Sequence, residues 1–170
     1  MRIRTKQKGF SLIELLIVVA IILIIAAIAI PNLLRAKMAA NEASAVGSLR
    51  TINTAAVAYS ATYDVGFPAN LANLGPGSPA VCATADLIDS VLAAGTKSGY
   101  KFTYTALGVT TTAAGCTGDS QFVTNAVPVS LGSTGQRSFC STESGVIRFD
   151  PTGAAAPVTE GTCIALAPLQ

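Results

Sequence analysis

Apolar side chains follow two different patterns along the first third of this chain. From Phe10 to Ile30 they are nearly continuous, and Glu14 is the only ionisable side chain among them. At about 1.5 Å per residue, a helix of this length would measure about 31 Å, close to the hydrocarbon thickness of a membrane. The sequence therefore predicts a transmembrane helix over residues 10–30.

Beyond Pro31 the apolar residues form a single stripe at helical spacing. The stripe consists of Val46, Leu49, Ile52, Ala56, Tyr59 and Tyr63. Polar and small residues are expected on the other side, namely Glu42, Ser44, Ser48, Arg50, Asn53 and Thr54. Steps of three and four place a stripe on one helix face. We therefore predict one helix from about residue 10 to about residue 62, in which residues 31–63 are an amphipathic continuation. Pro31 removes one backbone hydrogen bond and predicts a bend.

Residues 64–170 have the pattern of a small domain with an antiparallel sheet. Glycine and proline at residues 66–68 end the long helix, and residues 66–83 are expected to be irregular. A short helix is predicted from an N-cap at Thr84 to near Gly95. Strands are predicted at 100–105, 121–129, 137–142 and 146–149, the last two as a hairpin. The C-terminal 21 residues are expected to be a loop pinned by Cys163. The fold class is thus α+β: a long helix packed under a roughly four-stranded antiparallel sheet.

The charge is concentrated at the N-terminus. The net charge is +2, but four of the 11 basic residues lie before Phe10, and they are Arg2, Arg4, Lys6 and Lys8. Without them the chain has seven basic and nine acidic side chains. A basic surface for nucleic acid is therefore not expected. Basic residues beside a membrane helix stay in the cytoplasm, so the C-terminal part is expected to be exported.

The residue types needed for catalysis or metal binding are largely missing from the sequence. The chain has no histidine, which excludes Ser-His-Asp and Cys-His nucleophiles. No C-x-x-C spacing, EF-hand loop or phosphate-binding glycine loop occurs. We therefore expect no enzyme activity, no cofactor and no metal. The four cysteines lie in the part expected to be exported, where an even number favours two disulfides, and three pairings are possible.

Glu14 needs a physical reason, because a charged group inside a membrane segment is costly and usually functional. It lies one helical turn after Phe10, on the same face. If the chain were cut after Gly9, Phe10 would become an ammonium group that Glu14 could pair with, in the same chain or in a neighbouring helix. Alternatively, Glu14 only snorkels to the headgroups, and the segment is a plain signal anchor. Ala27-Ile28-Ala29 also has the form of a signal peptidase site, which would make it an ordinary signal peptide.

The sequence GFSLIELL at residues 9–16 resembles the N-terminal motif of type IV pilins, and the resemblance extends over about residues 8–63. It implies that a prepilin peptidase cuts after Gly9 and that the new N-terminus, Phe10, is methylated. Residues 1–9 would be the cleaved leader and residues 64–170 the globular head. The resemblance also implies that Glu14 pairs with the N-terminus of a neighbouring subunit and thereby sets the register of assembly.

A structural subunit of a type IV pilus is the function implied by this resemblance. Its partners would be copies of itself, the peptidase and methyltransferase, an inner-membrane assembly platform and membrane lipid. It would begin as a single-pass inner-membrane protein with a periplasmic head and end in an extracellular pilus. Cys82–Cys116 and Cys140–Cys163 are the favoured disulfides. The first would close the region around the short helix and first strand, and the second would bound a C-terminal loop, as in many pilins.

Two alternatives remain open at this point. A type II secretion pseudopilin or a minor pilin would share the same N-terminus, although four cysteines and a Ser/Thr-rich head favour a pilin. A signal-anchored periplasmic binding domain that never polymerises is an alternative of another class, and it would keep its leader uncut.

Overall fold

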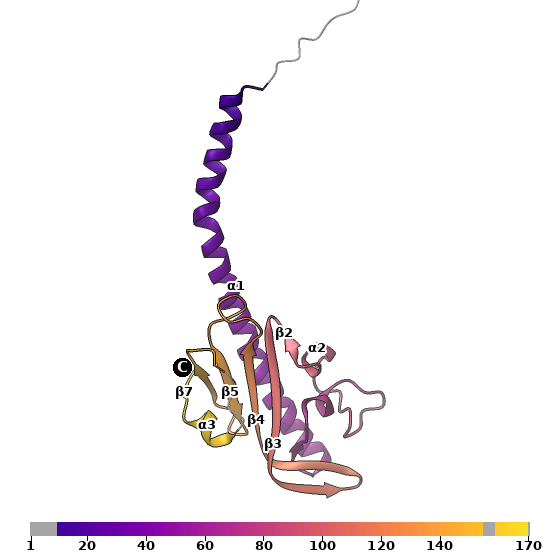
Figure 1. Cartoon of the computed structure of the whole chain (residues 1–170). Helices are drawn as coiled ribbons and strands as arrows, with labels where there is room; N and C mark the ends of the chain where they lie inside the picture. Colours follow the sequence, from indigo (N-terminus) through magenta and orange to yellow (C-terminus); the bar gives the residue numbers. More distant parts are fainter. Residues whose placement is uncertain (1–9, 155–158, 170) are drawn as a thin grey trace, which may run out of the picture. The chain divides into compact units, whose positions relative to one another are not determined.

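The computed structural model describes residues 10–154 and 159–169. The chain divides into two compact units, residues 1–36 and residues 37–170. One helix, α1 (Leu12–Tyr63), contributes to both units, and all strands belong to the second unit (Figure 1). A long apolar helix and an antiparallel sheet are present, so the predicted α+β class is confirmed.

Helix α1 begins and ends close to the predicted residues. At its start, the backbone N–H of Ser11 donates to Glu14 Oε2 at 2.9 Å, which satisfies one of the free donors of the first turn. The helix continues through Pro31. It ends where Asp64 and Gly66 adopt φ values of +54° and +92°, which are left-handed conformations that a helix cannot continue.

The buried face of α1 is wider than the predicted stripe. Leu49, Ile52 and Tyr59 are buried as expected. However, the polar residues Glu42, Ser48 and Asn53, which were placed on the opposite side, are also buried, and this prediction was wrong. Hydrogen bonds offset part of the cost of this burial, since Asn53 Nδ2 donates to Ser141 Oγ at 2.8 Å and Glu42 has the partners described below.

One antiparallel sheet contains all seven strands of the described chain, in the order β2-β3-β4-β5-β6-β7, with β1 paired to β4. The strands are β1 Phe67–Pro68, β2 Thr96–Lys97, β3 Tyr100–Ala113, β4 Cys116–Pro128, β5 Ser138–Thr142, β6 Ile147–Asp150 and β7 Ala167–Pro168. The four longer strands, β3 to β6, correspond to the four predicted strands, and β5 and β6 form the predicted hairpin. However, β3 continues to Ala113, beyond its predicted end at residue 105, and β4 begins at Cys116, before its predicted start at residue 121. The short strands extend the sheet at its edges and beside β4.

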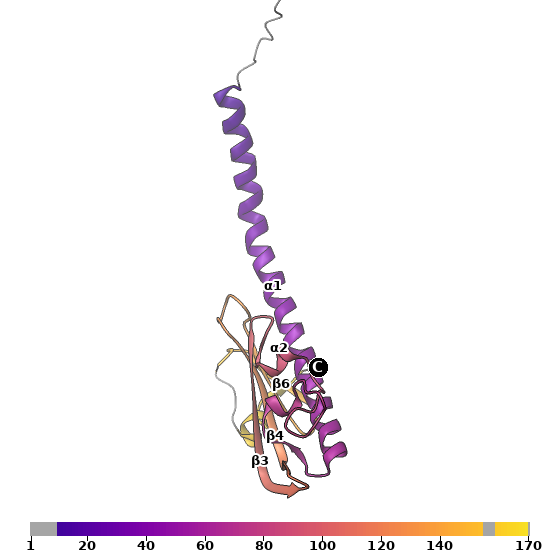
Figure 2. The same cartoon turned by 90° about the vertical axis from the view of Figure 1, so that its right-hand side faces the viewer.

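The main core lies between the sheet and residues 37–63 of α1. Figure 2 shows this part of α1 along one face of the sheet. Tyr100 and Phe102 of β3 and Phe139 of β5 point to that face and pack with Leu49 and Tyr59 in one buried cluster. Alternation along β3 is therefore the pattern of a strand with one buried face, as predicted.

Short helices and two-residue strands account for the remaining differences from the predictions. The predicted helix with an N-cap at Thr84 is instead α2 (Ser90–Ala93), capped by Asp89, whose carboxylate accepts from Leu92 N at 2.9 Å. The region predicted to be irregular contains β1 and the 3₁₀ helix η1 (Leu71–Leu74). The predicted C-terminal loop contains α3 (Glu160–Ile164) and β7.

Candidate functional site

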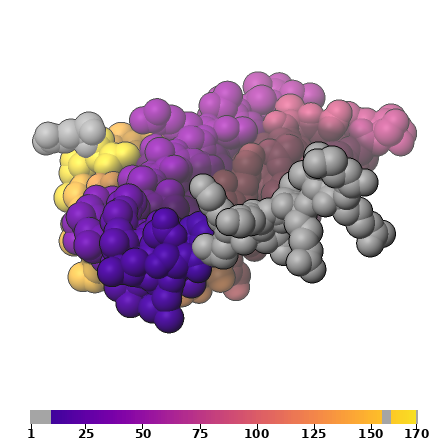
Figure 3. All heavy atoms as spheres, turned by 90° about the horizontal axis from the view of Figure 1, so that it is seen from above, coloured from indigo at the N-terminus to yellow at the C-terminus, as the bar shows by residue number. Residues whose placement is uncertain are grey.

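The first turns of α1 present an uninterrupted apolar surface. Every large apolar side chain from Leu12 to Val19 is between 45% and 79% exposed, and the surface continues to Leu34. The helix is long and apolar enough to cross a membrane, with a mean hydropathy of 3.3 over its most apolar 18 residues. These side chains form the indigo surface in Figure 3. Apolar surface on this scale requires lipid or another protein surface around it.

Glu14 is the one acidic group on this surface. Its Oε2 accepts from the backbone N–H of Ser11, and no other hydrogen bond to the carboxylate forms within residues 10–154 and 159–169. Among these residues, Oε1 therefore has no donor. Phe10, the other residue of the expected pair, is described and is 77% exposed. Gly9 and the basic leader lie outside the described residues.

A shallow hollow lies beside Glu14 on the same helix. Leu12, Leu15, Leu16 and Val19 line it, and its volume is about 290 Å³. Side chains three and four residues apart on a helix form such grooves, into which the side chains of a second helix can pack. The first turns of α1 thus combine an apolar groove, into which a second helix can pack, with a carboxylate that has one oxygen without a donor among the described residues.

A second group of polar residues, which sequence reasoning missed, fixes α1 to the sheet. Glu42 Oε2 accepts from Arg137 Nε at 2.8 Å and forms an ion pair with Arg137 Nη2 at 2.7 Å. Glu42 Oε1 accepts from the backbone N–H groups of Gln136 and Arg137, at 2.9 and 3.2 Å. The guanidinium lies 5.5 Å from the ring centres of both Phe139 and Phe149. We call these five residues the Glu42 cluster.

The spacing of Glu42 could have identified it from the sequence. It lies three residues before Ala45 and seven before Leu49, both of which are completely buried. The prediction started the apolar stripe at Val46 and therefore missed the first turn of the buried face. Arg137, far along the chain from Glu42, gave no signal in the sequence that it would be its partner.

Stability at acid pH should depend on Glu42. Burial raises the pKa of Glu42, but hydrogen bonds from Gln136 and Arg137 and the Arg137 charge lower it below the ordinary value of 4.5. A depressed pKa contributes stability above the unfolded-state value, and this contribution is lost as the pH falls through the folded-state value. Between about pH 6 and about pH 3, the parent chain should therefore lose more stability than Glu42→Gln, as measured by urea unfolding. Equal losses would contradict the role assigned to this carboxylate.

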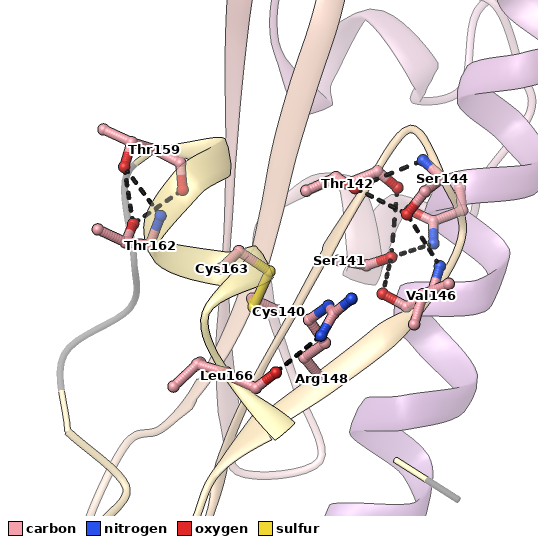
Figure 4. Close-up of a disulfide and its surroundings, with 11 residues drawn as sticks. Cys140, Ser141, Thr142, Ser144, Val146, Arg148, Thr159, Thr162, Cys163 and Leu166 are labelled. Atoms are coloured by element: carbon pink, nitrogen blue, oxygen red, sulfur yellow. Dashed lines mark hydrogen bonds between the residues drawn. A yellow bond between two sulfur atoms is a disulfide. The ribbon is translucent and has the colours of Figure 1, made fainter. Parts of the chain in front are cut away.

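The four cysteines form two bonds in the structure, Cys82–Cys116 and Cys140–Cys163. These are the pairs that the sequence analysis favoured. Figure 4 shows the second bond, between β5 and α3, with the Arg148 guanidinium donating to the Leu166 carbonyl oxygen nearby at 2.8 Å. Pro31, the other residue singled out, lies within α1. No group of three or more His, Cys, Asp or Glu side chains suited to a metal ion occurs among the described residues.

Comparison with known proteins gives a family match near the N-terminus and matches to parts of two known proteins. The family model described as the prokaryotic N-terminal methylation motif matches residues 4–30. The type IV wide pilus major component PilA4 of Thermus thermophilus is 69% identical over 35 residues, which are 21% of this chain and 27% of that protein. The type IV major pilin protein PilA of Myxococcus xanthus is 46% identical over 54 residues, 32% of this chain and 24% of that protein. No solved structure matches the chain.

The matches thus confirm the methylation motif at residues 4–30 and a partial resemblance to proteins named as type IV major pilins. They span about a quarter of the length of the relatives.

Proposed function

We propose that this chain is the precursor of a type IV pilus subunit, a structural protein rather than an enzyme. Residues 1–9 are the leader, residues 10–30 the helix that is held first in the membrane and then in the filament core, residues 31–63 its continuation, and residues 64–170 the head. A prepilin peptidase cuts after Gly9, and Phe10 is then methylated.

The observation that carries the proposal is the exposed apolar segment of α1 up to residue 30, in which Glu14 is the only ionisable side chain. A carboxylate with a free oxygen, one turn from a new N-terminal ammonium group, offers a pairing point that each copy can both provide and use. Close packing is supported by the small residues Ala20, Ala26, Ala27 and Ala29, which let helices approach one another. Pro31 supplies a weak point where the helix can adapt during packing.

The subunit's partners and location follow from the same assignment. It spans the inner membrane with a periplasmic head, in contact with lipid and an assembly platform, and joins copies of itself in an extracellular filament. A minor pilin or secretion pseudopilin would use the same N-terminus. The major-pilin names of both relatives favour the main subunit over these alternatives.

The intact mass of the membrane-bound and filament forms tests the proposal. We expect the mature chain to begin at Phe10, to carry one added methyl group and to occur in sheared surface filaments. A Gly9→Val chain is the control, because a side chain at this position obstructs close approach to a protease and should leave the leader uncut. A parent chain that keeps residues 1–9 and remains monomeric would instead support a signal-anchored periplasmic domain.

A further inference from the structure

The two disulfides differ sharply in how far solvent can reach them. Cys140 and Cys163 are both 0% exposed. Cys82 and Cys116 are only partly buried and lie at the margin of the main core. Thiol–disulfide exchange needs direct access of a thiolate to a sulfur atom. The difference in burial alone should therefore give the two disulfides different rates of exchange.

An open cavity of about 210 Å³ gives access to the more exposed bond. Cys82 forms part of its wall, together with Asn70, Asn73, Gly115 and Thr117. Gly115 turns the chain at φ +80° directly before Cys116. The cavity therefore gives a small thiol access to the surface of Cys82.

The buried bond is covered by contacts that would have to break first. Cys140 and Cys163 pack with Val123 in a separate apolar cluster between the sheet and α3. Helix α3 is held to the sheet by Gln121, whose Nε2 donates to Glu160 Oε2 at 3.1 Å. Attack on this bond thus requires local opening of α3. The rate of attack is therefore multiplied by the small fraction of time for which α3 is open.

We propose that Cys82–Cys116 is a site of thiol–disulfide exchange with dithiols, whereas Cys140–Cys163 is inert in the folded protein. An external thiolate bonds to the Cys82 sulfur, and the sulfur–sulfur bond breaks with its electron pair leaving on the Cys116 sulfur, which takes up a proton. The second thiol of the dithiol then closes on the first and releases Cys82 as a thiol. The dithiol is oxidised to a cyclic disulfide, and the cysteine pair gains two electrons.

Reduction would free one end of the sheet and leave the rest in place. The carbonyl oxygen of Cys82 stays bound by Tyr59 Oη at 3.1 Å and Asn73 Nδ2 at 3.3 Å, so this cysteine is held by the core. Cys116 starts β4, beyond a register shift between Leu107 and Thr110. The segment that gains mobility is therefore the end of the β3–β4 hairpin, residues 108–118.

Graded reduction of the full-length chain in detergent micelles tests this inference. Native protein is treated with dithiothreitol and iodoacetamide, and the alkylated peptides are quantified by mass spectrometry after a non-reducing map of the starting material. We expect Cys82 and Cys116 to be alkylated at least about tenfold faster than Cys140 and Cys163. Equal rates, the reverse order or a different starting pairing would overturn it.

Hydrogen exchange locates the consequence of reduction. Dithiothreitol should accelerate amide exchange in residues 108–118 and leave β5 unchanged. In the Cys82→Ser/Cys116→Ser chain, exchange in this segment should be fast from the start and insensitive to dithiothreitol. Acceleration throughout the sheet on reduction of the parent chain would mean that the bond stabilises the whole fold, contrary to the inference.

Discussion

Replacing Glu14 with alanine should lower the yield of filaments more than tenfold while the chain still accumulates in the membrane. In a bundle of apolar helices, the ammonium group of Phe10 would lose its partner, and breaking a buried ion pair costs about 3–5 kcal/mol. Because every subunit repeats this contact, the free-energy cost applies each time a subunit joins the filament. Immunoblots of the sheared filament and membrane fractions measure the effect.

Two further variants separate the loss of charge from other causes of a low filament yield. Glu14→Gln preserves the size of the side chain, so it should also assemble poorly if pairing with an ammonium group is what matters. Asp86→Asn is the matched control, because Asp86 is an exposed acid in the head and asparagine also tolerates its φ of +54°. Normal processing and normal filament yield in Glu14→Ala would refute the pairing.

Replacing Glu42 with alanine should destabilise the sheet-bearing unit by about 3 kcal/mol. The change leaves the backbone N–H groups of Gln136 and Arg137 without their acceptor and removes the partner of the Arg137 guanidinium. The Arg137 side chain is 40% exposed, so water would compensate part of its loss, which keeps the expected cost at the lower end for buried pairs. Urea unfolding followed by circular dichroism measures the change.

Arg50→Ala is the control for this prediction. Arg50 is an exposed cation on the same helix and forms no ion pair among the described residues, so its removal should change stability by no more than about 0.5 kcal/mol. The stability lost in Glu42→Gln should lie between the losses in Glu42→Ala and Arg50→Ala, because the amide oxygen can still accept from the backbone. If Glu42→Ala unfolds at the same urea concentration as Arg50→Ala, the Glu42 cluster does not fasten the helix.

Periodicity revealed those elements whose side chains face one environment over many residues. The continuous apolar run and the stripe from Leu49 to Tyr59 identified α1 within two residues at each end, because a helix this long repeats its signal many times. Alternation at Tyr100 and Phe102 likewise identified β3, since its two faces meet different surroundings.

Helices of four or five residues were misplaced or missed because tertiary contacts determine them, whereas the equally short strands β5 and β6 were predicted. The cap of α2 is Asp89 and not Thr84, and both are ordinary capping residues that sequence alone cannot rank. Helix α3 forms where Cys163 and Glu160 are tied to the sheet. Glu42 is different, because its spacing from Ala45 and Leu49 was a usable signal, and only its partner Arg137, 95 residues away, left none.

The position of the Glu42 cluster also determines how tension would enter the head. A pull along α1 from its N-terminal side would reach the sheet first through Asn41, whose amide donates to the Thr134 carbonyl oxygen at 2.9 Å, and through Glu42. The disulfides join other parts of the unit and would not share this first load. The weakest mechanical link between helix and sheet would then be a set of hydrogen bonds and one ion pair, which can re-form once the force is released.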